Sequence, residues 1–112
     1  MSKLLDEFNA YRDQMNQKIL EADNKVIKRL YSLDTLTYQD GALPVKTKEM
    51  LGLATSMVLR CDDCIKYHII KCHDLGLTKD EFFEVFSVVC TVGGTIVIPH
   101  LRRAVEFLEE LG

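Results

Sequence analysis

The 112-residue chain has the length of one domain and an ordinary globular composition, with 47% hydrophobic and 28% charged residues. Its net charge is −3 and its basic residues are scattered, which excludes the basic surface that nucleic acid requires. The N-terminal stretch carries acid where a signal peptide needs an apolar run, and no apolar window reaches the roughly 18 residues of a membrane span. We therefore expect a single cytoplasmic domain over residues 1–112, with neither nucleic acid nor membrane as a partner.

The first predicted element is one long helix. Between Leu4 and Leu33, apolar or small residues recur in steps of 4, 3 and 4 that repeat every eleven residues. Eleven residues in three turns is close to the natural helix period, so the pattern predicts a nearly straight amphipathic helix with a buried stripe. Residues 34–43 lose the period and include Asp40-Gly41, which indicates a connector.

Two further helices follow the connector. Pro44 suits the first turn of a helix that runs to about Leu59, because its missing N–H costs nothing there. Helical spacing resumes at Cys64 after a polar interruption and continues to Gly76, a residue typical of the position after a helix. The Cys61-x-x-Cys64 motif therefore lies at the start of the third predicted helix.

The last two helices have their own boundary signals. Thr78 and Glu81 form a predicted capping box, and Gly93-Gly94 should end or bend the helix that it opens. The final helix has Pro99 in its first turn and runs to about Leu111. Its predicted inner face consists of Leu101, Ala104, Val105 and Leu108. No segment alternates like a strand, so the predicted class is all-α with about five helices.

Residues 82–98 are apolar on nearly every side. Only Glu84, Ser87, Thr91 and Thr95 interrupt them before Pro99. A small monomer has too little interior to bury every face of such a helix. We therefore expect the chain to form a homo-oligomer through this segment.

The Cys61-x-x-Cys64 motif carries the chemistry. In a reducing compartment a close cysteine pair is more often redox-active, catalytic or metal-binding than structural. Cα atoms three residues apart in a first helical turn lie roughly 5 Å apart, which suits a reversible disulfide. His68 follows Cys64 by one turn on the same face and can exchange a proton with its thiol. Glu49 lies on another helix, so only tertiary packing could bring it to the site as a base.

These residues resemble a known family. Glu49, then Cys61-x-x-Cys64-x-x-x-His68, then residues 76–81 with the sequence Gly-Leu-Thr-Lys-Asp-Glu, and the later Gly93-Gly94 are similar to the carboxymuconolactone decarboxylase and alkylhydroperoxidase D-like family. The similarity covers about residues 44–110. The spaced glutamate, cysteine pair and histidine are far more specific than a bare cysteine pair.

The resemblance implies an all-helical, oligomeric peroxidase that forms trimers or hexamers. It implies that Cys64 attacks a small-molecule hydroperoxide, that Cys61 is the resolving thiol, and that His68 and Glu49 relay the proton. An external dithiol would reduce the disulfide, and no cofactor or metal is expected. The decarboxylase branch lacks the cysteine pair, so its activity is not implied. Asp63 stands where some of these peroxidases carry a tyrosine, and its charge opposes a Cys64 thiolate unless it points to solvent.

Two alternatives stay open from the residues alone. Cys61, Cys64, His68 and Glu49 could bind zinc, whereas Cys64 and Cys72 are about 12 Å apart along a rigid helix and could not share one ion. The chain could also be a non-catalytic helical oligomer that binds a metal or ligand, or senses redox state through the cysteine pair. The remaining candidates are expected to be structural: Cys72 and Cys90 as core residues, His73 and His100 as capping or packing residues, and Gly93-Gly94 as a bend.

Overall fold

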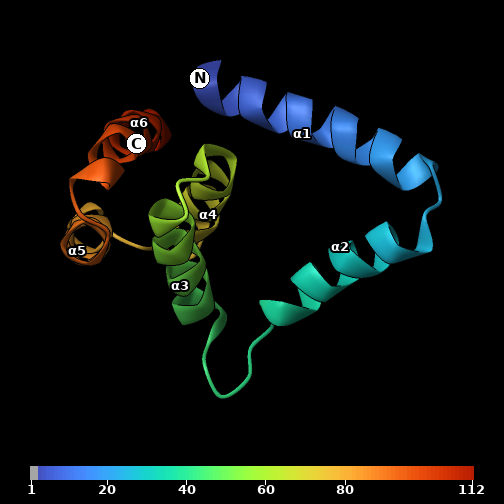
Figure 1. The fold of residues 1–112 in the computed structure, drawn as a ribbon, viewed down its shortest axis with the longest axis horizontal. Coiled ribbons are helices and arrows are strands. Elements are labelled where there is room, and N and C mark those ends of the chain that lie inside the picture. The colour runs from blue at the N-terminus through green and yellow to red at the C-terminus, as the bar shows by residue number, and fades with distance from the viewer. Residues whose placement is uncertain (1–2) are drawn as a thin grey trace.

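The computed structural model describes residues 3–112, and every regular element in that range is a helix. The all-α class predicted from the sequence is confirmed. The elements are α1 (Lys3–Glu21), α2 (Lys25–Thr37), α3 (Val45–Val58), α4 (Asp62–Asp74), α5 (Lys79–Gly93), the short 3₁₀ helix η1 (Thr95–Val97) and α6 (Ile98–Leu111). Figure 1 shows α3, α4, α5 and α6 grouped into a body, from which α1 and α2 extend as a V-shaped arm.

The N-terminal segment forms two helices, so the prediction of one helix over residues 4–33 is wrong. α1 ends at Glu21, and Asp23 has a left-handed backbone with a φ of 58°. Asn24 then caps α2, because its side-chain oxygen accepts a hydrogen bond from the Ile27 N–H at 3.1 Å. This cap satisfies one of the backbone N–H groups that have no partner within a new helix. It therefore favours the start of a second helix over continuation of α1. The apolar spacing persists across the break only because both helices are amphipathic.

The connector begins later than predicted, because α2 continues to Thr37 and leaves residues 38–44 between α2 and α3. The Lys48 ammonium of α3 donates hydrogen bonds to the carbonyls of Thr37 and Gln39, at 3.0 and 2.7 Å. These bonds hold the connector against the first turn of α3. They also place Tyr38 beside the α3–α4 pair.

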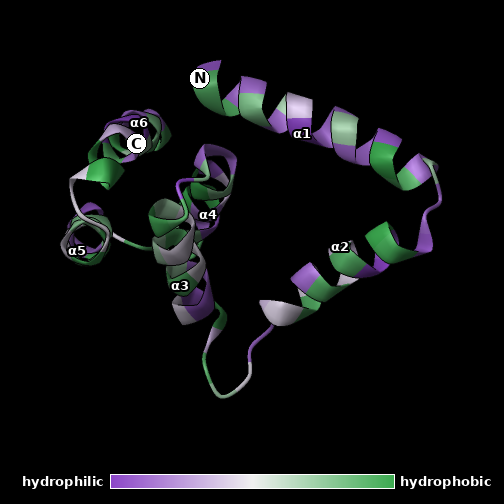
Figure 2. Cartoon of the chain, in the orientation of Figure 1, coloured by the Kyte–Doolittle hydropathy of each residue, from purple (hydrophilic) through white to green (hydrophobic). Residues whose placement is uncertain are grey.

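Among the described residues of the arm, only those at the beginning of α1 pack against the core. Phe8 packs against the core there, and its ring meets the Phe107 ring edge-on at 5.9 Å. No described residue of α1 or α2 is fully buried. Figure 2 shows that apolar positions recur along α2. Four of them are 57–68% exposed: Val26, Leu30, Leu33 and Leu36.

The core lies between α3, α4, α5 and α6. Its members are apolar side chains of these helices, together with Leu77 of the α4–α5 connection and Val97 of η1: Leu53, Met57, Ile65, Ile69, Cys72, Leu77, Phe82, Phe86, Val89, Val97, Ala104, Phe107 and Leu108. Cys72 is a core residue, as predicted, and burial raises the pKa of its thiol to about 12. Cys90 is free and partly buried.

The predicted helix boundaries after residue 43 are largely confirmed. The Thr78–Glu81 capping box is complete, and its hydrogen bonds lower the pKa of the Glu81 carboxyl. Gly76 has a φ of 88° directly after α4, a conformation that favours glycine. Gly94 has a φ of 80° and ends α5. Pro44 is the N-cap of α3 rather than a first-turn residue.

The α5 segment is only half covered. Phe82, Phe86 and Val89 are buried in the core. Other apolar side chains of the segment are 43–74% exposed in the single chain: Phe83, Val88 and Val92 of α5, and Ile96 of η1. Subunit contacts through residues 82–98 therefore stay a prediction. The exposed apolar side chains of this segment are available for such contacts.

Candidate redox site

The structure brings Glu49 of α3 and His68 of α4 together. Glu49 Oε1 lies 2.7 Å from His68 Nδ1, and both side chains are buried, with 3% and 7% of each residue exposed. A buried carboxylate with one short hydrogen bond to an imidazole holds the ring in one orientation. The spacing of nineteen residues could not show this pairing, because it depends on how α3 and α4 pack.

Gly52 is what lets the two helices approach at this point. A Cβ atom at Gly52 would lie 2.6–2.9 Å from three atoms of the His68 ring, which is closer than carbon atoms pack. The residue is therefore part of the site, although the sequence analysis did not single it out. Its signal was present in the sequence: a glycine inside a predicted helix, one turn after Glu49.

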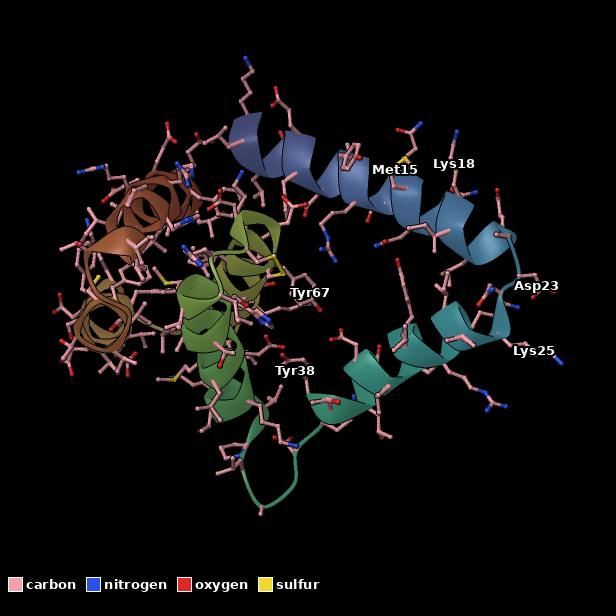
Figure 3. The ribbon with its side chains drawn as sticks, viewed as in Figure 1. Met15, Lys18, Asp23, Lys25, Tyr38 and Tyr67 are labelled. Atoms are coloured by element: carbon pink, nitrogen blue, oxygen red, sulfur yellow. A yellow bond between two sulfur atoms is a disulfide. The ribbon has the colours of Figure 1, made fainter. Side chains whose placement is uncertain are left out.

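The cysteine pair opens α4 as predicted. Cys61 is the N-cap and Cys64 lies in the first turn; the two are joined by a disulfide with a Cα–Cα distance of 5.3 Å. The Cys64 N–H donates to the Cys61 sulfur at 3.3 Å, so the sulfur takes the place of a capping oxygen. Figure 3 shows the disulfide beside Tyr67. Cys64 is exposed, whereas Cys61 is partly buried.

Cys64 and His68 open onto the same cavity, which has a volume of about 200 Å³. Its lining comes from three helices: Arg12 of α1, Asp34 of α2, and Asp63, Cys64, Tyr67 and His68 of α4. The Arg12 guanidinium stacks on the Tyr67 ring, 4.6 Å from its centroid. Because Asp63 is exposed, its charge beside Cys64 stays hydrated. The arm therefore forms one wall of the space in front of the reactive sulfur.

Two tyrosines flank the imidazole, and the sequence analysis gave neither of them a role. Tyr38 Oη lies 3.5 Å from His68 Nε2, and the Tyr67 ring meets the His68 ring edge-on at 5.2 Å (Figure 3). Burial raises the pKa of Tyr38 and of Tyr67, and the Glu49 carboxylate raises both further. Both phenols are therefore protonated at neutral pH and available as donors.

The other histidines lie outside this pair. His73 is in the last turn of α4, as predicted. His100 lies in the first turn of α6, where its Nδ1 pairs with Asp62 Oδ1 at 2.8 Å. Within residues 3–112, no group of three or more histidine, cysteine, aspartate or glutamate side chains is arranged to hold a metal ion.

Comparison with known proteins agrees with this geometry. The family model for the carboxymuconolactone decarboxylase family matches residues 24–107, which is most of the chain. The chain belongs to the carboxymuconolactone decarboxylase family. The resemblance inferred from the cysteine, histidine and glutamate spacing is thereby confirmed. The match begins at Asn24 and so includes α2 as well as the body.

Relatives of the family share both fold and sequence with the chain. A carboxymuconolactone decarboxylase family protein of Thermotoga maritima, described as possibly involved in antioxidative response, is 50% identical with a TM-score of 0.89, over 94% of this chain and 89% of that one. An apo family protein of Legionella pneumophila is 27% identical with a TM-score of 0.73, over 94% of each chain. The alkyl hydroperoxide reductase AhpD of Corynebacterium kroppenstedtii is 32% identical over 56 residues, which cover 50% of this chain and 32% of that reductase.

None of the helices in the described part of the chain is both long enough and apolar enough to cross a membrane.

Proposed function

We propose that the chain is a thiol-dependent peroxidase of the alkylhydroperoxidase D-like type. One observation carries the proposal: Cys64, which a disulfide joins to Cys61, shares a cavity with the imidazole of a buried carboxylate–imidazole pair. The cysteine pair in its reduced dithiol form supplies two electrons and is oxidised to the disulfide, and the buried pair supplies a fixed proton acceptor. Cysteine, histidine and acidic side chains gathered around a cavity are typical of active sites.

The acid–base roles follow from which ring nitrogen is engaged. Glu49 accepts the hydrogen bond of His68 Nδ1–H, so the lone pair of neutral His68 is on Nε2. Nε2 is then the atom that takes a proton from the Cys64 thiol. Glu49 stabilises the imidazolium that results, as a buried carboxylate does for a histidine base.

The proposed reaction balances with a hydroperoxide and a dithiol as co-reactants. The Cys64 thiolate attacks the terminal peroxide oxygen, the O–O bond breaks, and the alkoxide leaves as an alcohol with the proton from His68. Cys64 is then a sulfenic acid. Cys61 loses its proton, and its thiolate attacks the Cys64 sulfur, closes the disulfide and displaces hydroxide, which leaves as water with that proton. An external dithiol reduces the bond by exchange and is itself oxidised to a disulfide.

The relatives support this assignment. The description of the Thermotoga maritima protein points to antioxidative response, and the Corynebacterium kroppenstedtii protein is an alkyl hydroperoxide reductase. The chain matches about a third of that reductase, so we propose its activity for this chain rather than infer it from the match alone. We also propose that the chain acts as a homo-oligomer, since the exposed apolar faces of α2 and α5 are large for a lone small domain. The compartment that we propose for it is the cytoplasm.

A thiol count tests the proposed function. The fully reduced chain is mixed with stoichiometric cumene hydroperoxide, quenched at matched times and mapped by mass spectrometry. We expect loss of two of the four thiols, both in the Cys61–Cys64 peptide, with Cys72 and Cys90 still reduced. A double variant, Cys61→Ser with Cys64→Ser, is the control for non-specific oxidation. If the wild-type chain loses thiols no faster than this control, the chain is not a peroxidase.

A further inference from the structure

A second cluster of charged side chains surrounds Asp62, the residue directly after Cys61. Asp62 Oδ1 lies 2.8 Å from His100 Nδ1, and Asp62 Oδ2 lies 3.1 Å from Arg103 Nε. The two partners are three residues apart on one face of α6, so both reach the same carboxylate. Neither partner belongs to the Glu49–His68 pair, and the peroxidase chemistry described above does not use them.

The proton positions in this cluster follow from charge. Burial raises the pKa of Asp62, but the hydrogen bond from His100 and the charge of Arg103 outweigh it, so the pKa lies below its ordinary range. Asp62 is therefore ionised at neutral pH, and His100 Nδ1 must carry a proton to face it. The Arg103 Nη2 atom, 3.2 Å from the same nitrogen, then contributes charge rather than a hydrogen bond to it.

The position of Asp62 gives the cluster a consequence for the cysteine pair. A bare carboxylate next to Cys61 opposes formation of its thiolate, whereas the Cys64 N–H that donates to the Cys61 sulfur favours it. The Arg103 guanidinium, 3.1 Å from Asp62 Oδ2, opposes the first effect, and the contact with His100 holds the carboxylate in place. Only the thiolate of Cys61 attacks a sulfenic acid, so the charge balance at Asp62 affects how fast the disulfide closes.

We propose that His100 and Arg103 of α6 are positioning residues for Cys61, which neutralise and hold the Asp62 carboxylate and so keep the Cys61 thiol reactive. This inference rests on the proposed redox function of the pair. It assigns α6 a part in the resolving half of the reaction, separate from the part of α3 in the attacking half.

The test measures the reactivity of Cys61 without peroxide. In a Cys64→Ser background, the alkylation rate of Cys61 by iodoacetamide at pH 7 is followed by peptide mass spectrometry. We expect Arg103→Gln to slow alkylation about two- to fivefold, the effect of an uncompensated nearby charge in a largely hydrated setting. His100→Gln should slow it in the same direction through a separate contact.

Two further variants separate electrostatics from structure. Arg102→Gln is the matched control, because it removes the neighbouring arginine of α6, for which no contact with Asp62 is seen. Asp62→Asn combined with Arg103→Gln should restore the rate, since no carboxylate is left to neutralise. A double variant as slow as Arg103→Gln alone, or equal slowing by Arg102→Gln, overturns the proposal. Unchanged alkylation in both Arg103→Gln and His100→Gln overturns it too.

The alkylation experiment and the thiol count can fail separately. A chain that failed the thiol count with cumene hydroperoxide would still give an alkylation rate for Cys61. Conversely, a chain that passed the thiol count and showed equal alkylation in all variants would keep the peroxidase assignment and lose only this inference.

Discussion

Replacing Gly52 by alanine should disable the site while leaving the fold nearly intact. The new methyl group would lie 2.6 Å from the nearest atom of the His68 ring, whereas carbon atoms pack at about 3.5 Å. The ring would have to withdraw by about 1 Å. It would then leave the 2.7 Å contact with Glu49 and change its position in front of Cys64.

Gly52→Ala should change the free energy of unfolding much less than it changes the rate of Cys64 oxidation. Alanine is favoured over glycine inside a helix by about 1 kcal/mol, and overpacking costs about 1–3 kcal/mol, so the net loss of stability is about 0–2 kcal/mol. A 1 Å misplacement of a catalytic group costs about 10²-fold in rate. The rate of Cys64 oxidation should therefore fall by about two orders of magnitude, while the melting temperature falls by at most about 10 °C.

Stopped-flow measurement of the first turnover with hydroperoxide gives the rate, and circular dichroism gives the melting curve. Gly41→Ala is the matched control, because a Cβ there would make ordinary contact, at 3.6 Å from Lys48 Nζ. If a Gly52→Ala chain oxidises Cys64 at the wild-type rate, the rate does not depend on where the His68 ring lies, and the prediction is refuted. A chain that is unfolded at 25 °C would refute the estimate of stability.

Four further predictions follow from the site and the surface. Cys64→Ser should abolish peroxide consumption, whereas Cys61→Ser should complete one turnover and leave a sulfenic acid that dimedone traps; the reverse pattern would exchange the two roles. His68→Ala and Glu49→Gln should each slow attack roughly 10²-fold with unchanged circular dichroism, and a loss of helix instead would make the pair structural. Because the pKa of Asp62 is lowered in the folded chain, its stabilising effect is present above its unfolded pKa and lost as pH falls below about 4. The melting temperature should therefore drop further in the wild type than in Asp62→Asn between pH 7 and pH 3, and parallel curves would contradict this. Light scattering at micromolar concentration should give a multiple of 12.8 kDa, and a mass of one chain would rule out the homo-oligomer.

The sequence predicted the body of the fold closely because its boundary signals are local. Thr78 and Glu81 cap a helix through contacts within one turn, and Gly76 ends one through its own backbone angle. The same locality explains the error in the N-terminal segment. A period of apolar residues can continue across a break between two amphipathic helices, and it is the short Asp23-Asn24 signal that marks the restart of the chain.

The pairings at the site were decided only by tertiary structure. Periodicity predicts which face of a helix is buried but not which face of another helix it meets. Glu49 and His68 meet because Gly52 lets α3 and α4 approach, and Asp62 meets α6 because the two helices cross near the cysteine pair. The spacing of Cys61 and Cys64 was sufficient for a disulfide, since both lie in one helical turn. The remaining contacts join residues that lie nineteen or more positions apart, and no local signal specifies them.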